Sequence, residues 1–139
     1  MALAADRNLT EKDGRLQAMK QGVNTIFKNA LVMLAVDGYL KPAASGAGNQ
    51  FAGIAYEGSI NAGAAGDKQP RVEMTGTWIL PGTGFTQAMV GEKVFAVDDA
   101  TVTTTEGTGS KLVVGFIVGF ISATEVEVKI TPFAGTGAA

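Results

Sequence analysis

The 139-residue chain contains neither cysteine nor histidine. Without cysteine it can form no disulfide bond, offers no thiol nucleophile and holds no metal through thiolates. Without histidine it has no Ser–His or Cys–His catalytic pair, no imidazole ligand for zinc and no side chain that ordinarily titrates near neutral pH. Most common hydrolase and zinc mechanisms are therefore excluded, and we expect neither an enzyme nor a bound cofactor.

Long apolar runs and a strong net charge are also missing. The most apolar stretch, residues 112–121, is about half the length of the ~20 residues that a membrane helix needs. Asp6 and Arg7 come before any apolar run of the kind that a secretory signal requires. The net charge is −2, without the basic stripe that is typical of nucleic-acid-binding proteins. We therefore expect a protein made in the cytoplasm of the cell that expresses it, with neither a membrane nor a nucleic acid as its partner.

Positive charge is concentrated near the N-terminus. Residues 1–28 carry five basic and three acidic side chains, whereas the remainder carries six basic and ten acidic ones. Residues 1–24 have few apolar side chains, so we predict an extended N-terminal arm there with at most one or two helical turns. The basic side chains of this arm either keep the chain in solution or dock on an acidic groove of a partner. The candidate contact residues are Arg7, Lys12, Arg15 and Lys20.

Residues 25–131 have the pattern of a β domain. Short apolar or alternating runs are separated by turn signals roughly every 8–12 residues, which favours an all-β fold. We expect a single β-sandwich, jelly-roll-like fold or partly open barrel of about seven to eight strands. A flexible C-terminal tail of small residues is expected at 132–139. No internal repeat is evident beyond the tripeptide Gly-Thr-Gly.

The first part of this domain gives three local predictions. Residues 26–36 are almost continuously apolar apart from Lys28 and Asn29, and they predict a strand. The following Asp37-Gly38 predicts a hairpin with a type I′ turn, because both central positions of that turn need positive φ. Residues 71–80 alternate apolar and polar side chains, which predicts one half-buried strand.

The last part of the domain predicts a pair of longer strands. Residues 112–121 are apolar on both faces, which indicates a central strand. Gly115 and Gly119 lie on the same face of that strand, where they indicate either the close approach of another backbone or a bend of the sheet. Residues 125–131 alternate apolar and charged side chains, so we expect a strand with a charged outer face.

Two groups of acidic residues are candidate sites, and both have a simpler interpretation. Asp98, Asp99 and Glu106 could bind a hard cation such as calcium, but the alternating ligand spacing is missing and a solvated turn is favoured. Glu125 and Glu127 resemble a glycosidase pair in their spacing, yet they alternate with core residues as an ordinary outer face would. Neither group is taken as a site.

The aromatic residues provide little support for a carbohydrate platform. Trp78, the only tryptophan, shares the apolar face of its predicted strand and is expected in the core. Tyr39 and Tyr56 do not cluster with it in the sequence. Arg71 and Glu73 share the polar face and predict a surface ion pair of little energetic weight.

Several motifs occur in a specific order over residues 23–131. They are Lys28–Leu34, Asp37–Ala43, Phe51–Gly58, Asn61–Gly63, Val72–Leu80, Val90–Asp99, Val114–Val118 and Glu125–Val128. In this order they resemble the small bacteriophage capsid cement (decoration) proteins. The resemblance implies a β-sandwich or jelly-roll-like protein on the outer surface of an icosahedral head, present as a homodimer or homotrimer. Such a protein clamps neighbouring major capsid protein subunits and has no catalytic residues.

Other functions are compatible with the same fold. A carbohydrate- or receptor-binding β-sandwich of a head fibre or tail component would need clustered exposed aromatic side chains. A tail-tube or head-fibre subunit would have a composition like that of a cement protein. An enzyme would have to use the carboxylates of Glu125 and Glu127, which is the least favoured of these hypotheses.

Overall fold

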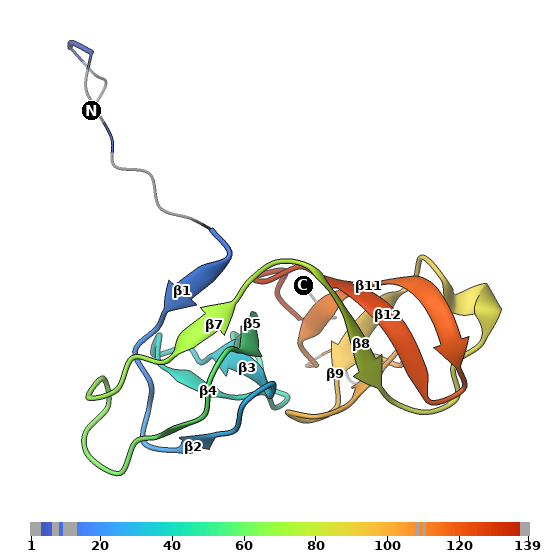
Figure 1. Ribbon diagram of the computed structural model, residues 1–139, viewed down its shortest axis with the longest axis horizontal. Coiled ribbons are helices and arrows are strands. Elements are labelled where there is room, and N and C mark those ends of the chain that lie inside the picture. The colour runs from blue at the N-terminus through green and yellow to red at the C-terminus, as the bar shows by residue number, and fades with distance from the viewer. Residues whose placement is uncertain (1–3, 7–8, 10–13, 108, 110, 137–139) are drawn as a thin grey trace.

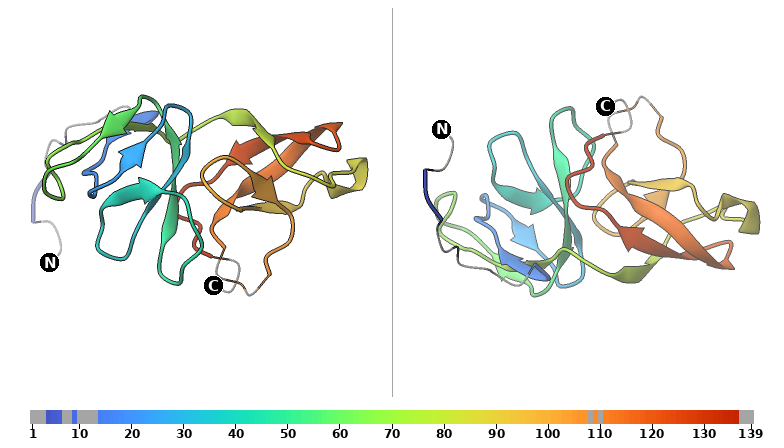
Figure 2. Two further views of the ribbon diagram at one scale, coloured as in Figure 1. Left: turned by 90° about the horizontal axis from the view of Figure 1, so that it is seen from below. Right: turned by 90° about the horizontal axis from the view of Figure 1, so that it is seen from above.

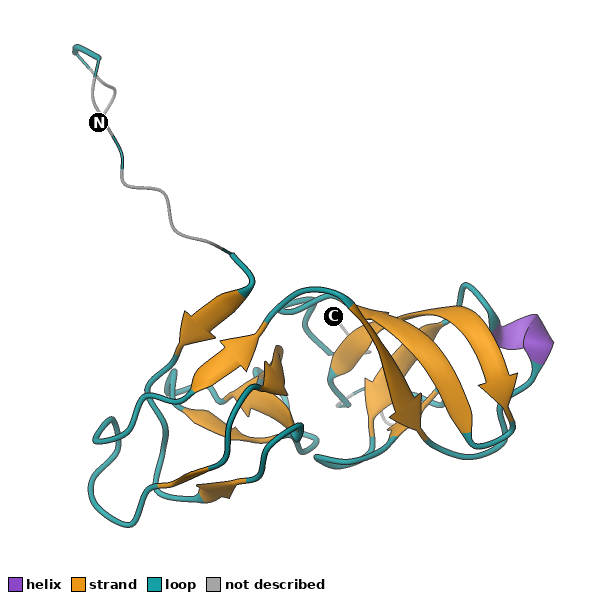
Figure 3. Ribbon diagram, in the orientation of Figure 1, coloured by secondary structure: helices purple, strands orange, loops and turns teal. Residues whose placement is uncertain are grey.

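The computed structural model describes residues 4–6, 9, 14–107, 109 and 111–136, and this part of the chain is almost entirely β-structure (Figure 3). Its one helical element is η1 (Gln87–Met89), a single turn of 3-10 helix. The predicted all-β fold class is therefore confirmed. The described residues form twelve short strands rather than about seven to eight, because turns and bulges divide several of the predicted runs.

The first half of the body is a curled five-stranded sheet with the order β1-β7-β5-β3-β4 (Figure 1). Its strands are β1 (Leu16–Ala18), β3 (Leu31–Leu34), β4 (Leu40–Pro42), β5 (Gln50–Ala55) and β7 (Arg71–Glu73). A parallel bridge between Gln21 and Leu40 joins β4 to the segment that follows β1, so the sheet curls back on itself. A separate ribbon pairs β2 (Thr25–Ile26) with β6 (Ser59–Ile60). The apolar cluster on the inner side contains Met19, Ile26, Ala30, Val32, Leu40, Ala52, Ala55 and Val72.

The second half is another curled five-stranded sheet, with the order β10-β9-β11-β12-β8. Its strands are β8 (Thr77–Pro81), β9 (Lys93–Ala96), β10 (Val102–Thr103), β11 (Val113–Ser122) and β12 (Glu125–Ile130). A parallel bridge between Gly82 and Val102 joins β10 to the segment that follows β8. As predicted, β11 is central, and the charged side chains of β12 are exposed while its apolar ones are buried.

The two sheets pack side by side along the long axis of the molecule (Figure 2). One continuous apolar cluster connects them, and it combines Leu31, Met33, Ala43, Phe51 and Ile54 with the buried side chains of the second sheet. Two backbone hydrogen bonds also join the halves. The Leu31 amide donates to the Asp99 carbonyl at 2.8 Å, and the Phe133 amide donates to the Phe51 carbonyl at 2.8 Å. The halves therefore share a core in a sandwich-like arrangement.

The two sheets have the same topology. The five strands of each sheet are counted here in chain order, as β1, β3, β4, β5, β7 and as β8, β9, β10, β11, β12. In both sheets the first strand pairs with the fifth, the fifth with the fourth, the fourth with the second and the second with the third. The ribbon of β2 and β6 is not part of either sheet. The third strand of each sheet then forms a parallel bridge with the segment that follows the first strand. All of the direct strand pairings are antiparallel in both sheets.

The registers of the two sheets agree as well. Val32 pairs with Gly53 in the first sheet, and Val94 pairs with Gly115 in the second, so the counterparts are 62 positions apart in both cases. In both sheets the register shifts directly beside this pair, between Val32 and Met33 on β3 and between Val113 and Gly115 on β11. The bulge is thus repeated together with the strands around it.

Hydrogen bonds outside the strands repeat in the same way. The Asn29 amide donates to Ala55 at 2.8 Å, and the Gly91 amide donates to Ile117 at 2.7 Å. Asn29 and Gly91 both have positive φ, at 66° and 97°. We therefore describe the body as two copies of one structural unit, repeat 1 (residues 15–74) and repeat 2 (residues 76–130).

The expectation that the chain has no internal repeat is therefore wrong at the level of structure. Over residues 25–55 and 87–117 the counterparts are identical at three positions only, namely Val32/Val94, Asp37/Asp99 and Gly53/Gly115. Either repeat needs only apolar side chains of suitable volume inside and a glycine at the bulge, so the fold does not require sequence identity. The duplication is visible in the backbone hydrogen bonds and not in the amino-acid sequence.

Part of the predicted arm belongs to the β body. Residues 16–18 form β1, which pairs antiparallel with β7, and Met19 and Gln21 are buried. The Gln21 side chain donates to the Ser59 carbonyl at 3.1 Å and accepts from the Ser59 hydroxyl at 2.6 Å. The expected arm thus ends near Gly14, and no helical turn occurs over residues 14–24. The strand is short and its partner is distant in sequence, so local periodicity does not reveal it.

The predicted strand over residues 71–80 is wrong, because it is two strands in different repeats. β7 ends at Glu73, β8 begins at Thr77, and Gly76 between them has φ 106°. Apolar and polar side chains therefore continue to alternate across the junction of the two repeats, although the strand does not. Val72 lies inside repeat 1, and Trp78 is half-buried against the shared core.

The Asp37-Gly38 hairpin is present, but its turn is not type I′. Gly38 has φ 83°. Asp37 does not have positive φ, because Asn29 and Phe133 are the only non-glycine residues in the described part of the chain that do. The Gly38 amide donates to Ala35 at 2.8 Å and the Ala35 amide donates to Tyr39 at 3.1 Å. This pattern fits a three-residue loop, in which one glycine with positive φ is sufficient.

The expected flexible tail over residues 132–136 is attached to the body. The Phe133 amide bonds to Phe51, and the Val113 amide donates to Gly135 at 3.0 Å. Thr136 also forms an isolated bridge with Leu112. The rest of the predicted tail, 137–139, lies outside the described residues.

Candidate functional site

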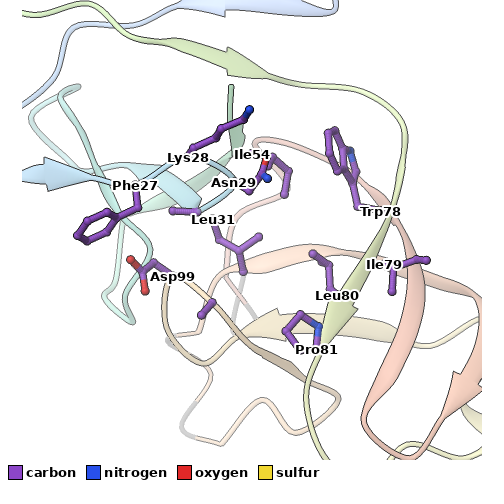
Figure 4. A pocket seen from close by; sticks show the side chains of 12 residues that line it. Phe27, Lys28, Asn29, Leu31, Ile54, Trp78, Ile79, Leu80, Pro81 and Asp99 are labelled. Carbon is purple, nitrogen blue, oxygen red and sulfur yellow. The ribbon is translucent and has the colours of Figure 1, made fainter. Parts of the chain in front are cut away.

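A groove with a volume of about 460 Å³ opens between the two repeats (Figure 4). Residues 27–31 and Ile54 of repeat 1 form one side, and residues 78–81 and 99–100 of repeat 2 form the other. The groove exists because the turn before β3 faces β8 and the β9–β10 hairpin across the junction. No single segment of the sequence could reveal it.

The groove is apolar at its base and carries charge at its rim. Leu31, Ile54 and Leu80 are buried. Phe27 and Ile79 are large apolar side chains on opposite sides of the opening, and they are 68% and 58% exposed. Figure 4 shows that Lys28 and Asp99 also come from the repeat 1 and repeat 2 sides of the groove, respectively. Such a surface favours a ligand with an apolar side chain between polar groups.

The repeat 2 wall is held by hydrogen bonds in the β9–β10 hairpin. One carboxylate oxygen of Asp98 accepts from the Ala100 amide at 2.8 Å and from the Thr101 amide at 2.9 Å. These bonds, above all the one from Ala100, lower the pKa of Asp98 below its ordinary value, because they favour the ionised form. The ordered hairpin in turn places the Asp99 carbonyl where it accepts from Leu31 of repeat 1.

Replacing Asp98 by asparagine should therefore destabilise the protein by about 0.5–1 kcal/mol at pH 7, since the bonds to a charged acceptor are weakened. The folded-state pKa lies below the ordinary value of 3.8. The contribution of ionised Asp98 is thus complete above that value and is lost as the pH falls through the folded-state pKa. Urea unfolding of both proteins at pH 7 and in acid tests this. A stability difference that is the same at both pH values would contradict it.

The predicted arm residues are not brought together in the described structure. Arg7 and Lys12 lie outside the described residues. Arg15 forms an ion pair with Glu73 of β7, and Lys20 is exposed in the segment that bridges to β4. Arg15 is therefore part of the body rather than of an arm, and a contact of these residues with a partner stays a prediction.

The predicted pair of Arg71 and Glu73 is wrong, because both side chains have other partners. Arg71 pairs with Glu57 at 3.1 Å and lies over the Tyr56 ring at 4.7 Å from the centroid. The Arg71 guanidinium lowers the pKa of Glu57 by donating hydrogen bonds to its carboxylate. The arrangement holds the loop after β5 against β7, and Glu73 is left to bind Arg15.

The acidic candidates lie in different surroundings. Within the described ranges, no three acidic side chains lie close enough together to hold a metal ion. Asp98 instead orders its own turn, as the solvated-turn interpretation predicted. Glu125 and Glu127 are exposed on the outer face of β12.

The three candidate aromatic residues have different surroundings. Tyr56 stacks with Arg71, and Tyr39 lies next to Gly66. Trp78 lines the groove and donates its indole N–H to the Thr75 carbonyl at 3.2 Å. Sequence reasoning placed Trp78 in the core and did not identify the groove. The available signal was the interruption of the apolar run at Lys28 and Asn29, which marks the turn that forms one wall.

The helices in the described part of the chain include none long and apolar enough to cross a membrane. Comparison with known proteins finds no matching family model, no matching curated protein and no matching solved structure.

Proposed function

We propose that the protein is a structural virion component, a capsid cement protein that binds the outside of an icosahedral phage head. It stabilises the contacts between neighbouring major capsid protein subunits. The observation that carries the proposal is the presence of large exposed apolar side chains on separate faces of one body. A protein that clamps two neighbours needs at least two such contact surfaces.

The exposed apolar side chains lie on both halves of the molecule. On repeat 1, Ile60 lies in β6, Phe27 directly follows β2 and Val23 shortly precedes it, and all three are exposed. On repeat 2, Val118 and Ile121 are exposed toward the end of β11. Figure 1 shows that β2 and the C-terminal end of β11 lie toward opposite ends of the long axis. Exposed apolar groups of this kind mark protein interaction surfaces when they gather in patches.

The construction of the body also suits a clamp. Two curled sheets share one apolar core and are joined by backbone hydrogen bonds, so the distance between the two surfaces is fixed. A standard protein interface buries roughly 1,600 Å² in total. A symmetric shell repeats each contact many times, and modest individual interfaces then add up to a stable lattice.

The N-terminal segment gives the most direct mutational test of head binding. A chain that carries both Arg7→Glu and Lys12→Glu should bind undecorated heads at least about tenfold more weakly, because reversing the charge of the segment removes its attraction to an acidic capsid surface. A chain with Lys68→Glu and Lys111→Glu has the same net charge and serves as the control. Cosedimentation with heads measures occupancy. Equal binding by the two double variants would contradict a role for the segment.

A further inference from the structure

One edge of β8 is free and lies beside the groove. β8 is the last strand of its sheet and pairs with β12 on one side, while no described strand pairs with its other side over Thr77–Pro81. Residues 78–81 of the same strand line the groove. A free edge offers a row of backbone N–H and C=O groups to which an extended segment can add.

Comparison of the repeats shows that the exposed rim is not a requirement of the fold. Phe27 of repeat 1 and Met89 of repeat 2 are counterparts, because each accepts a hydrogen bond from the residue three positions later, Ala30 or Glu92. Met89 packs against the apolar core, whereas Phe27 is 68% exposed at the groove. The repeat fold can therefore pack the side chain at this position against the core, but in repeat 1 the side chain is exposed.

The N-terminal segment of the chain has the properties of a ligand for this groove. Thirteen residues precede Gly14, and fully extended they reach about 40 Å. Leu9, a large apolar side chain, is 76% exposed. In the sequence it lies between Arg7 and Glu11, and the rim of the groove carries the complementary charges on Asp99 and Lys28.

We propose that copies of this chain exchange their N-terminal segments. Residues 7–11 of one copy add as a strand to the free edge of β8 in a second copy, and the Leu9 side chain fills the groove between Phe27 and Ile79. In its own chain Leu9 is exposed and is not among the residues that line the groove, so a second copy is the occupant. The exchange requires no capsid, so association of the purified chain tests it separately from head binding.

Two complementary variants of the full chain test this exchange. Leu9→Asp replaces the apolar side chain of the segment by a carboxylate and leaves the groove unchanged. Ile79→Asp places a carboxylate at the groove and leaves the segment unchanged. Each alone should weaken self-association at least about tenfold, because a carboxylate would have to be buried against an apolar surface. An equimolar mixture should associate again, since one variant supplies the groove and the other the segment. Val36→Asp, at an exposed apolar position away from the groove, should behave like the unmodified chain.

Sedimentation velocity over a concentration series measures the association, and the emission of Trp78 reports occupation of the groove by a shift to shorter wavelength. The unmodified chain should form dimers or larger species with this shift. A chain that stays monomeric at all concentrations, or a mixture of the two variants that does not associate, would overturn the proposal. If Ile79→Asp alters the urea midpoint, Phe27→Asp on the opposite rim takes its place.

Discussion

Replacing Gly115 by alanine should destabilise the protein by at least about 2–3 kcal/mol. A Cβ at this position would collide with the carbonyl of Lys129 on the neighbouring strand, where backbone leaves no room to move. Gly53→Ala should have an effect at least as large. Its Cβ would collide with the carbonyl of Glu73, and its φ of 145° is one that residues with side chains rarely adopt. Urea unfolding followed by the fluorescence of Trp78 measures both.

Gly14→Ala is the matched control for these two variants. No atom lies within 4 Å of the position that its Cβ would take, so the stability should change by less than about 0.5 kcal/mol. Large effects at both Gly53 and Gly115 would show that the two repeats depend on the same close strand contact. An effect at Gly115 as small as that at Gly14 would contradict the pairing of Gly115 with Ile130 between β11 and β12.

Truncating Phe51 to alanine should cost about 3–5 kcal/mol, because the side chain is fully buried where the two repeats meet. Phe116→Ala removes the same atoms from a side chain that is 39% exposed, and it should cost clearly less. The unfolding of both variants should remain a single transition, because the repeats share one core. Urea or thermal unfolding monitored by circular dichroism and by Trp78 emission tests this.

Two outcomes would contradict this account of the shared core. One is a separation of the two probes in the Phe51→Ala protein, with Trp78 of repeat 2 unfolding apart from the bulk of the β-structure. The other is a cost for Phe116→Ala equal to that for Phe51→Ala. The first result would show that the repeats are independent domains rather than halves of one cooperative unit. The second would show that burial between the repeats gives Phe51 no special weight.

The strands that the sequence predicts well are those with long, regular patterns. Residues 112–121 and 125–131 correspond closely to β11 and β12, because an alternation over six to ten residues depends only on which side of the sheet is buried. The two glycines of β11 also have the expected explanation. Gly115 lies against the backbone of Lys129, and the strand is bulged near Gly119.

Features that depend on pairing between distant segments could not be predicted in this way. β1 is recognisable only through its pairing with β7, and the partner of Arg15 is Glu73, far along the chain. The duplication could not be recognised from the sequence, because apolar residues replace one another freely in a core. The groove joins a turn of repeat 1 to an edge strand of repeat 2, so its residues are neighbours in space alone.

The central claim is that the protein is part of a phage head and holds its subunits together. The most direct test is to measure the mass and protein content of purified virions of the phage that encodes it, before and after osmotic shock. We predict a fixed copy number relative to the major capsid protein, exposure of the chain on the outer surface, and heads that rupture more readily when it is missing. Virions that lack the chain, or that carry only a few copies in the tail, would contradict the claim.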